Sequence, residues 1–581
     1  MNVNPVVSEI VSGALRSLEE EVEDLLARIW RSPALRDARD FSVSLYDRFG
    51  RALTGGSLGA GPGPILASFG AEEMNPGDIF LHNDPYLPPA GLGEVAEICL
   101  TRPLYDENRL IAFLQVRGRH DDLGGVRPGG GAAGASESYH EGLLIPPVRI
   151  ALGGERVRDI QALLLRNSRF PDLLSDDIDA QAGALQVGAL RIRELLERYG
   201  SEQLTACFAD LLRECEVAFK EELLPKISEE KLVVDARVET DGFGGPHPLR
   251  VTIFREGDRL VIDLEGAAPQ AKGPINCPLE GEGATSLARL ISPLLLYLAD
   301  DQTRAAGILV NDGACRAIEV RLPGPGTILT PRFPAPTGLR ALTMGRLLSA
   351  FAEALFLSAR GNIPAGFDNL RSFSLWGRNG DESSFLFREA IGAGGGAAPR
   401  LDGISGIPPI GGSGGMSVEV VEARYPIRIE SAGLVPDSGG AGERRGGLGT
   451  FREYRLLASG HASSAAESGG PGPFGGNGGA PGGAYRISVT GNSGKTRKIP
   501  AVTAAHPFEP GDLVRVETPG GGGWGEPKKR VPEAVRLDAV RGLISREAAR
   551  KIYAVALGHS PEYPVNENET ANLRDEQPKK G

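Results

Sequence analysis

Apolar residues recur at helical spacing at the start of the chain. Between residues 5 and 31 they fall three or four positions apart, at Val7, Ile10, Val11, Leu15, Leu18, Val22, Leu25, Leu26 and Ile29. This period of about 3.6 residues predicts a long amphipathic helix whose apolar face packs against the core or another subunit. The next run, FSVSLYD, alternates apolar and polar residues and meets a turn at residues 47–50, so it predicts a strand.

Strand and helix patterns then follow in blocks. Between residues 75 and 150 the short apolar runs IFL, AEICL, LIAFLQV and LLIPPVRI alternate with loops rich in Gly and Pro, which predicts a mixed or antiparallel sheet layer. Residues 156–232 have an almost wholly helical pattern. From residue 233, alternating runs with Gly-Asp and Asp-Gly turns predict antiparallel strands. The apolar segments 283–299 and 341–358 predict helices on either side of a rigid Pro-rich loop.

Glycine is dense between residues 390 and 485. One interpretation is a flexible linker of low complexity. Strand-like runs between the glycines, namely VEVVEARYPIRIE, TFREYRLLA and YRISVTG, favour instead a packed β region. In such a region glycine supplies positive φ and lets backbones approach closely.

The end of the chain combines a helical hairpin pattern near residues 531–557 with a charged tail that predicts disorder. The whole pattern predicts an α+β protein with large multi-layer mixed sheets, long helices, a Gly-rich β region and a C-terminal helical hairpin. We expect an N-terminal α+β domain with the candidate site loops (1–232), a central β/α domain (233–390), a Gly-rich β domain (391–530), C-terminal helices (531–560) and a disordered tail (561–581).

Composition excludes several classes of protein. The 581 residues are enough for several domains, and a net charge of -12 without a basic stripe argues against nucleic acid as a partner. Five cysteines without a CxxC pair are typical of a reducing cytoplasm. The start of the chain does not resemble a signal peptide. No stretch approaches about 18 uninterrupted apolar residues, so we expect no membrane span and a cytoplasmic location.

The candidate chemistry is concentrated between His82 and Gly142. This stretch holds three of the seven histidines and several acidic residues in turns punctuated by Gly and Pro. They are His82, Asp84, Glu94, His120, Asp121, Asp122, His140 and Glu141. Imidazoles and carboxylates that converge from rigid loops predict a metal site or a general acid–base pair. The alternative is that these side chains are simply solvated loop residues.

Other motifs favour structural roles. Asp176, Asp177 and Asp179 are candidate metal ligands, but carboxylates at the start of a helical pattern more often cap free N–H groups. GAGERRGG lacks the Lys-Ser/Thr of a phosphate loop, and no Walker pattern occurs in the chain. TPGGGGWGEP either cradles an anion with consecutive N–H groups or forms a tight turn at a sheet edge.

Motifs spread over nearly the whole chain stand in an order that resembles the hydantoinase B/oxoprolinase family. They are RDFSVSLYD (39–47), NPGDIFLHNDPY (75–86), DDLGGVRPG (121–129), EGLLIPPVRI (141–150), GPINCPL (273–279), PDSGGAGERRGGLG (436–449), TPGGGGWGEP (518–527) and PEAVRLDAVRGLISREAARKIY (532–553). That family contains the second subunit of ATP-dependent enzymes that open hydantoins and lactams. It also contains the large subunits of biotin-free acetone and acetophenone carboxylases.

The resemblance implies a division of labour between two subunits. ATP and Mg²⁺ are bound by a hydantoinase A-type subunit, which phosphorylates a carbonyl or enol oxygen of a small-molecule substrate, and the B-type subunit completes hydrolysis or carboxylation. It implies a hetero-oligomer with two-fold symmetry and a divalent metal (Zn, Mn or Fe) in the B-type subunit. The implied metal ligands are Asp40, Glu94 and His120, with His140 as a replacement ligand, and the implied catalytic residues are Asp122, Asp84 and Asn83.

Three departures from the family pattern affect this metal site. Gly91 stands where one histidine is expected, and Arg119 stands where the first of two tandem histidines is expected. Residues 402–407 read DGISGI in place of an Asp-Gly-x-His-Thr-His run. A guanidinium cannot ligate a metal and repels it, so these changes should weaken zinc binding. His82 or His140 would compensate only if the fold brought them close.

Three hypotheses follow for the function. The first is a B-type subunit of an ATP-dependent hydrolase of a hydantoin, 5-oxoproline or lactam, in which the metal activates water for attack on the phosphorylated intermediate. The second is a subunit of a ketone carboxylase of the acetone or acetophenone type. The third is a catalytically degenerate subunit kept for assembly. The hydrolase ranks first because it is the commoner activity of the family.

Overall fold

The chain forms two compact units. The computed structural model describes residues 4–55, 61–87, 93–130, 133–300, 310–368, 371–381, 383–408, 414–466, 472–559 and 561–575. One unit comprises Met1–Met344, Glu382–Arg388 and Gly411–Met416, and the other comprises Gly345–Asp381, Glu389–Ile410 and Ser417–Gly581. This grouping differs from the predicted one, in which residues 1–232 and 233–390 are separate, because elements on both sides of residue 232 pack into the first unit.

The first unit is built on a six-stranded antiparallel sheet of order β1-β4-β3-β2-β5-β6. The strands are β1 (Phe41–Asp47), β2 (Ile79–His82), β3 (Glu97–Asp106), β4 (Arg109–Arg119), β5 (Val148–Leu152) and β6 (Glu155–Arg156). The strands predicted between residues 39 and 150 are therefore confirmed. Successive side chains of each strand point to opposite faces, so this sheet has two faces of different character.

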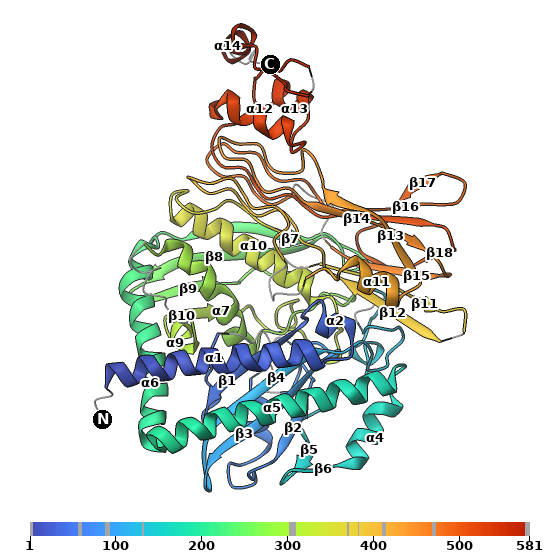
Figure 1. Cartoon of the computed structure of the whole chain (residues 1–581). Helices are drawn as coiled ribbons and strands as arrows, with labels where there is room; N and C mark the ends of the chain where they lie inside the picture. Colours follow the sequence, from blue (N-terminus) through green and yellow to red (C-terminus); the bar gives the residue numbers. More distant parts are fainter. Residues whose placement is uncertain are drawn as a thin grey trace. The chain divides into compact units, whose positions relative to one another are not determined.

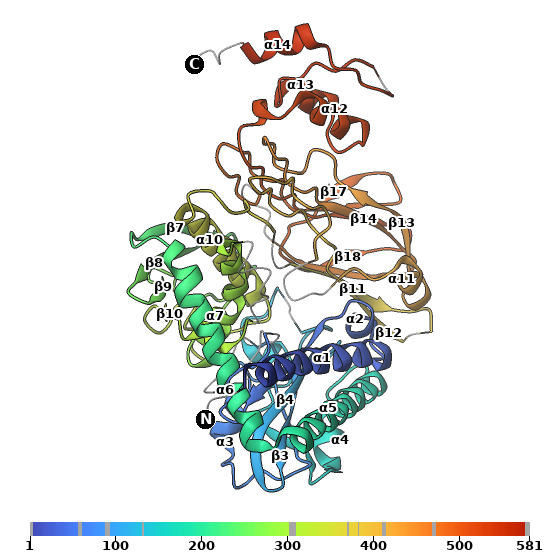
Figure 2. The ribbon, with the colours of Figure 1, turned by 60° about the vertical axis from the view of Figure 1, so that its left-hand side comes forward.

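Helices α1 (Pro5–Ile29) and α5 (Pro171–Tyr199) lie side by side on one face of this sheet (Figure 1, Figure 2). The buried stripe of α1 packs against apolar strand residues and α5 in one continuous core. Its members on α1 are Val11, Leu15, Leu18, Val22 and Leu26. Gly188 lets α5 approach β4, because a Cβ there would lie 2.3 Å from Leu114 Cδ2. The predicted N-terminal helix is confirmed.

The first unit also contains a second, four-stranded sheet of order β10-β9-β8-β7. Strands β7 (Leu232–Val238), β8 (His247–Glu256) and β9 (Arg259–Asp263) are antiparallel neighbours, and β10 (Ile318–Arg321) runs parallel to β9. The helices are α2 (Pro33–Arg36), α3 (Gly63–Ser68), α4 (Arg158–Arg166), α6 (Ser201–Ala218), α7 (Glu282–Leu295) and α9 (Asp312–Cys315), and β12 (Ser384–Glu389) is a further strand. The predicted helical block and the strands after residue 233 are confirmed.

Helix α10 (Arg340–Ser358) spans the boundary between the two units. By length and composition alone it is the one helix of the described segments that qualifies as a membrane span, and 72% of its apolar window is buried. Core helices of globular proteins meet the same test. The helix confirms the apolar segment predicted at 341–358.

The second unit contains a five-stranded antiparallel sheet of order β13-β14-β19-β16-β17. Its strands are β13 (Ile427–Leu434), β14 (Thr450–Leu456), β16 (Arg486–Thr490), β17 (Thr496–Lys498) and β19 (Leu513–Glu517). Strands β11 (Ser372–Arg378), β15 (Gly460–Ala465) and β18 (Thr503–Phe508) pair antiparallel beside one another. This confirms a packed β region rather than a linker.

Glycine-rich segments of the second unit stack directly on one another. The amide of Gly447 donates to the carbonyl oxygen of Gly395 at 2.9 Å, and that of Gly521 donates to Gly447 at 2.9 Å. A Cβ added to Gly521 would lie only 1.9 Å from the Gly395 oxygen. We call these stacked segments the glycine ladder. It shows that the N–H groups of Gly521 and its neighbours Gly522 and Gly523 bind carbonyl oxygens, so TPGGGGWGEP is not an anion cradle.

The C-terminal helices confirm the predicted hairpin and correct the predicted disordered tail. Helices α12 (Pro532–Val540) and α13 (Arg546–Lys551) form the hairpin. A further helix, α14 (Glu567–Asp575), lies in the segment predicted to be disordered. It is anchored because Thr570 is buried and its Oγ1 accepts a hydrogen bond from Ala556 N at 3.0 Å. Residues 576–581 lie outside the described part.

Two local predictions are wrong. The run VEVVEAR forms helix α11 (Val418–Arg424), not a strand, and it starts at Ser417, whose Oγ accepts from Val420 N at 3.3 Å. Asp176, Asp177 and Asp179 do not cap their own helix, because α5 begins earlier, at Pro171. Asp177 instead accepts hydrogen bonds from the backbone of Arg31 at 2.7 Å and Ser32 at 3.2 Å, which hold the segment that leads into α2.

Candidate functional site

The face of the six-stranded sheet opposite α1 and α5 carries charged side chains at one end. In the pairing of β3 with β4, Glu97 lies opposite Arg119 and Cys99 lies opposite Arg117. Ile98, between them, points into the apolar core. Strand alternation therefore gathers the charged residues of both strands on one face.

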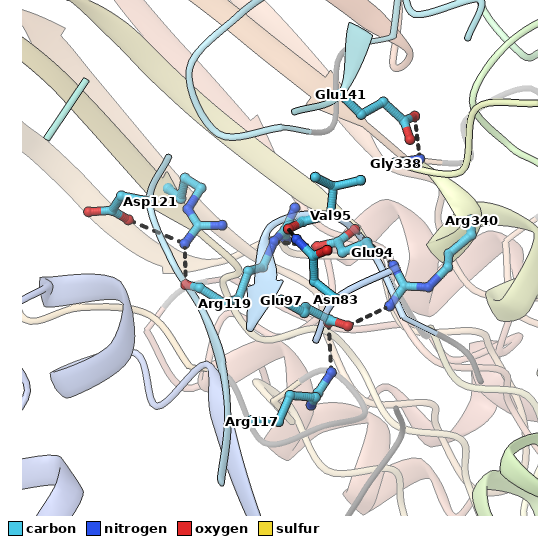
Figure 3. A network of polar contacts seen from close by, with 11 residues as sticks. Asn83, Glu94, Val95, Glu97, Arg117, Arg119, Asp121, Glu141, Gly338 and Arg340 are labelled. Atoms are coloured by element: carbon cyan, nitrogen blue, oxygen red, sulfur yellow. Dashed lines mark hydrogen bonds and ion pairs between the residues drawn. The ribbon is translucent and has the colours of Figure 1, made fainter. Parts of the chain in front are cut away.

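Five charged residues form a continuous ion network on this face (Figure 3). Glu97 contacts Arg117 Nη1 at 2.6 Å and Arg340 Nη2 at 3.0 Å. Glu94 contacts Arg340 Nη1 at 2.8 Å and Arg119 Nε at 2.5 Å. All five side chains are buried or nearly so, and Arg119 is the most exposed of them at 20%. Arg340 is the first residue of α10, so this helix start is held against the N-terminal end of β3.

Mutual attraction favours the charged forms of Glu97 and Arg119. Burial alone would raise the pKa of Glu97, but the charges of Arg117 and Arg340 outweigh it and hold that pKa below its usual value. Burial likewise disfavours the charged form of Arg119, but Glu94 and Asp40 keep its pKa above the usual value. Asp40, which directly precedes β1, therefore lies within electrostatic reach of the network, and its carbonyl oxygen accepts from Arg119 N at 3.1 Å.

Glu141 anchors the segment that carries Arg340. Its carboxyl accepts hydrogen bonds from the backbone amides of Thr337 at 3.0 Å and Gly338 at 2.6 Å. Burial raises the pKa of Glu141 to about 7 even though these hydrogen bonds oppose the shift, and the charge of Glu94 adds to it. Glu141 is thus poised between its two protonation states near neutral pH.

His120 faces the other side of the sheet. It directly follows Arg119 at the end of β4. Its ring lies against Trp30, with ring centroids 5.9 Å apart, and its Nε2 donates a hydrogen bond to Gln181 Oε1 at 3.0 Å. Burial lowers the pKa of His120 to about 4. Neighbouring residues in extended chain point in opposite directions, so His120 does not join the network that Arg119 joins.

The three predicted catalytic residues have different environments. Both oxygens of Asp122 contact Arg169, through N at 2.7 Å and Nη1 at 2.8 Å. The side chain of Asn83 bonds backbone groups only, including Val95 O at 2.6 Å and Ile145 N at 2.7 Å. These contacts hold the surrounding loops in place. They do not test the catalytic roles of Asp122 and Asn83, which stay predictions.

Asp84 keeps one oxygen without a hydrogen bond to any described residue. Its Oδ1 accepts from Tyr86 N at 2.8 Å. Burial raises the pKa of Asp84 above its usual value. A half-buried carboxyl with a free oxygen and a raised pKa is suited to accept or donate a proton.

The predicted metal ligands do not assemble. Within the described segments, no group of three or more His, Cys, Asp or Glu side chains is placed to hold a metal ion. Asp40 lies beside the ion network, and Glu94 belongs to it, with both of its oxygens bound by guanidinium groups. His120 faces away, and His140 lies in the short turn Ser138–His140 with its Nδ1 accepting from Ser136 N at 3.3 Å. These residues do not fit a divalent metal.

Sequence reasoning missed Glu97, Arg117 and Arg340. The first two were detectable, because alternation within EICLT and QVRGR places a charge on the same face of each strand. Arg340 carries no such signal, since it stands 246 positions from Glu94, which it binds. Asp402 of the DGISGI segment lies elsewhere, bound to Arg530 at 2.8 Å in the second unit.

Comparison with known proteins covers almost the whole chain. A family model described as Hydantoinase B/oxoprolinase matches residues 4–527. The B-type subunit of a putative D-/L-hydantoinase from Pseudomonas sp. (strain NS671) is 28% identical, over 98% of each chain. The crystal structure of the ATP-dependent caprolactamase from Pseudomonas jessenii aligns over 99% of this chain and 100% of that chain, with a TM-score of 0.84 and 26% identity. A nucleotide-free acetone carboxylase has the same fold, with a TM-score of 0.83 at 19% identity over 98% of this chain and 82% of the other.

Proposed function

The chain belongs to the hydantoinase B/oxoprolinase family, and we propose from this premise that it is the B-type subunit of an ATP-dependent enzyme that hydrolyses a cyclic amide. The observation that carries the proposal is the end-to-end match. The chain covers 98% of the hydantoinase relative and 100% of the aligned chain of an ATP-dependent caprolactamase. The substrate class is a hydantoin, a 5-oxoproline or a lactam.

The proposal assigns ATP to a partner. The chain contains no Walker pattern and no phosphate loop, and its most glycine-rich turn uses its N–H groups within the glycine ladder. ATP and Mg²⁺ are bound by a hydantoinase A-type subunit, which phosphorylates the substrate, and this chain completes the hydrolysis within a cytoplasmic hetero-oligomer. The relative from Pseudomonas sp. is itself designated a subunit, which supports such a complex.

Asp84 is the residue that we propose for proton transfer. It combines a raised pKa, partial burial and an oxygen with no hydrogen bond to the described residues. It lies in the NDPY turn that directly follows β2, on the sheet that carries the ion network. Removing a general acid or base typically lowers turnover about 10²–10⁴-fold.

The experiment is to purify this chain with an A-type partner and measure phosphate release with hydantoin, 5-oxoproline and caprolactam. We expect ring opening only when both subunits and ATP are present. Asp84→Asn should lower turnover by about 10²-fold or more while the complex still assembles. ATP hydrolysis by the highly purified single chain would refute the assignment of ATP to the partner.

The carboxylase is the second candidate, favoured by the fold shared with acetone carboxylase. The same complex should then be assayed with acetone or acetophenone, ATP and bicarbonate. Incorporation of labelled bicarbonate without any ring opening would replace the hydrolase proposal. A complex that assembles but performs neither reaction would identify the chain as a subunit retained for assembly.

A further inference from the structure

Arginine side chains carry the positive charge of the candidate site. The two oxygens of Glu94 contact Arg119 Nε at 2.5 Å and Arg340 Nη1 at 2.8 Å. Arg119 stands at the position where the family resemblance places a metal-binding histidine. We propose that the guanidinium group of Arg119, held by Glu94, takes the place of a divalent metal ion as the resident positive charge of this site.

Among the described residues, the cluster pairs carboxylates with guanidinium groups, and Glu141 lies within reach of the charge of Glu94. Three carboxylates lie within electrostatic reach of three guanidinium groups. The carboxylates are Asp40, Glu94 and Glu97, and the guanidinium groups are those of Arg117, Arg119 and Arg340. An added divalent ion would leave excess positive charge in buried surroundings, where unpaired charge is strongly unfavourable. To bind Glu94, the divalent ion would have to displace an arginine side chain. The displaced guanidinium would then be a buried charge without a partner, which is strongly destabilising.

Two of the three imidazoles near these strands are engaged by hydrogen bonds to other residues. His120 faces the opposite side of the sheet and bonds Gln181 at 3.0 Å. His140 accepts from Ser136 N at 3.3 Å. His82 lies on β2 opposite Cys99, and its buried Nε2 has no hydrogen-bond partner among the described residues. Within the segments that the structure describes, no three His, Cys, Asp or Glu side chains are grouped as the ligand set that zinc prefers.

Arg119 supplies a positive charge as a metal ion would, but it holds a bound group through hydrogen bonds rather than by coordination. Its Nε makes an ion contact with Glu94 Oε1 at 2.5 Å, no contact of its Nη atoms with another described residue is seen, and its side chain is 20% exposed. A fixed guanidinium presents two parallel N–H donors to an oxygen pair. The group that Arg119 binds follows from the proposed function. It is the oxygen pair of a phosphoryl group or a developing oxyanion.

Metal content tests the proposal independently of any activity. The purified full-length chain, alone and in its complex, is freed of adventitious metal by brief chelation and then analysed for Zn, Mn and Fe. We expect well below one ion per chain, and no change of Tm on adding EDTA or Zn²⁺. Near-stoichiometric metal that disappears in Glu94→Gln would overturn the proposal even if no substrate were found.

A single substitution should convert the site toward a metal centre. In Arg119→His one oxygen of Glu94 is released, an imidazole is added and the cluster becomes net negative, so we expect a higher Tm in the presence of Zn²⁺. Arg109→His, at the exposed start of the same strand, is the matched control and should not respond. Equal responses of wild type, Arg119→His and Arg109→His would contradict the proposal.

Arg119→Lys separates charge from donor geometry. A lysine keeps the positive charge but lacks the planar fork. We expect it to remain metal-free and folded, and to raise KM or lower kcat of the complex at least tenfold once a substrate is known. If Arg119→Lys bound Zn²⁺ as Arg119→His does, positive charge at this position would not be what excludes the metal.

Discussion

Gln181 determines which nitrogen of His120 carries the proton. Its amide nitrogen donates to the carbonyl oxygens of Ile98 at 3.1 Å and Val116 at 2.9 Å, so its Oε1 is the atom that faces His120 Nε2. That oxygen only accepts, so Nε2 must be protonated. With its pKa lowered to about 4, His120 is neutral at pH 7 and its Nδ1 presents a buried lone pair without a partner among the described residues.

His82 should make stability depend on pH. Burial lowers its pKa from 6.5 to about 4. Between these two pH values, His82 is protonated in the unfolded chain and neutral in the folded chain. The contribution of neutral His82 is complete above pH 6.5 and is lost as pH falls toward 4, by roughly 3 kcal/mol for a shift of this size. We expect the Tm advantage of wild type over His82→Gln to shrink across this range.

The control for this prediction is His559→Gln, because His559 is exposed. It should follow the pH profile of wild type throughout. If His82→Gln and wild type gave parallel curves of Tm between pH 7 and pH 5, the lowered pKa of His82 would be wrong.

Individual residues also limited what the sequence could predict about the site. Asp40 and Glu94 were found from motifs and do lie at the ion network. The proposed grouping of His120 with them failed because Arg119 and His120 are adjacent and point to opposite faces. Partner choice between charged side chains depends on which strands pair, and that is not encoded locally.

At the scale of elements, the spacing of apolar residues predicts secondary structure correctly where the pattern extends over many residues. The nine apolar positions of the first helix and the pattern of the C-terminal hairpin identified their elements. Short segments were decided by caps and tertiary contacts instead. VEVVEAR is β-branched yet helical because Ser417 caps it, and α14 forms because Thr570 is buried.

Close packing between α5 and β4 gives an element-scale prediction. Gly188→Leu would place a side chain where a Cβ alone approaches Leu114 Cδ2 to 2.3 Å. Overpacking of this kind costs about 1–3 kcal/mol or more, so we expect a lower Tm in thermal melts. Gly183→Leu in the same helix is the matched control, because nothing lies within 4 Å of its Cβ position. A Tm for Gly188→Leu equal to that of the control would show that α5 can move away from the sheet.

At the scale of the whole molecule, contacts between distant segments define each unit. In the second unit, Arg530 binds Asp402 at 2.8 Å and Asp538 at 2.8 Å, so the C-terminal helices are tied to residues more than a hundred positions earlier. The family resemblance predicted a common fold, which the structural match confirms. The division into two units was not readable from composition, because elements on both sides of residue 232 share one unit.

Removal of the C-terminal helices should destabilise the second unit. Val535 and Tyr553 belong to a buried cluster that includes Ala441, beside the glycine ladder. A chain that ends at Arg530 loses this cluster and the contact of Arg530 with Asp538, while Arg530 keeps its contact with Asp402. We expect poor solubility and rapid proteolysis. A chain that ends at Asp575 retains the cluster and should behave as wild type, and equal behaviour of both truncations would refute this role.

The glycine ladder determines how the protein responds to missense mutations in its glycine codons. Every glycine codon begins with GG, and any single-nucleotide change that alters the amino acid installs a residue with a Cβ atom. At Gly521 that atom would meet the carbonyl oxygen of Gly395 at 1.9 Å. Missense changes there therefore have no mild outcome, in contrast to a leucine core, where a change to valine or isoleucine is often tolerated. In a deep mutational scan, the ladder should stand out as a segment where alanine scores as poorly as tryptophan.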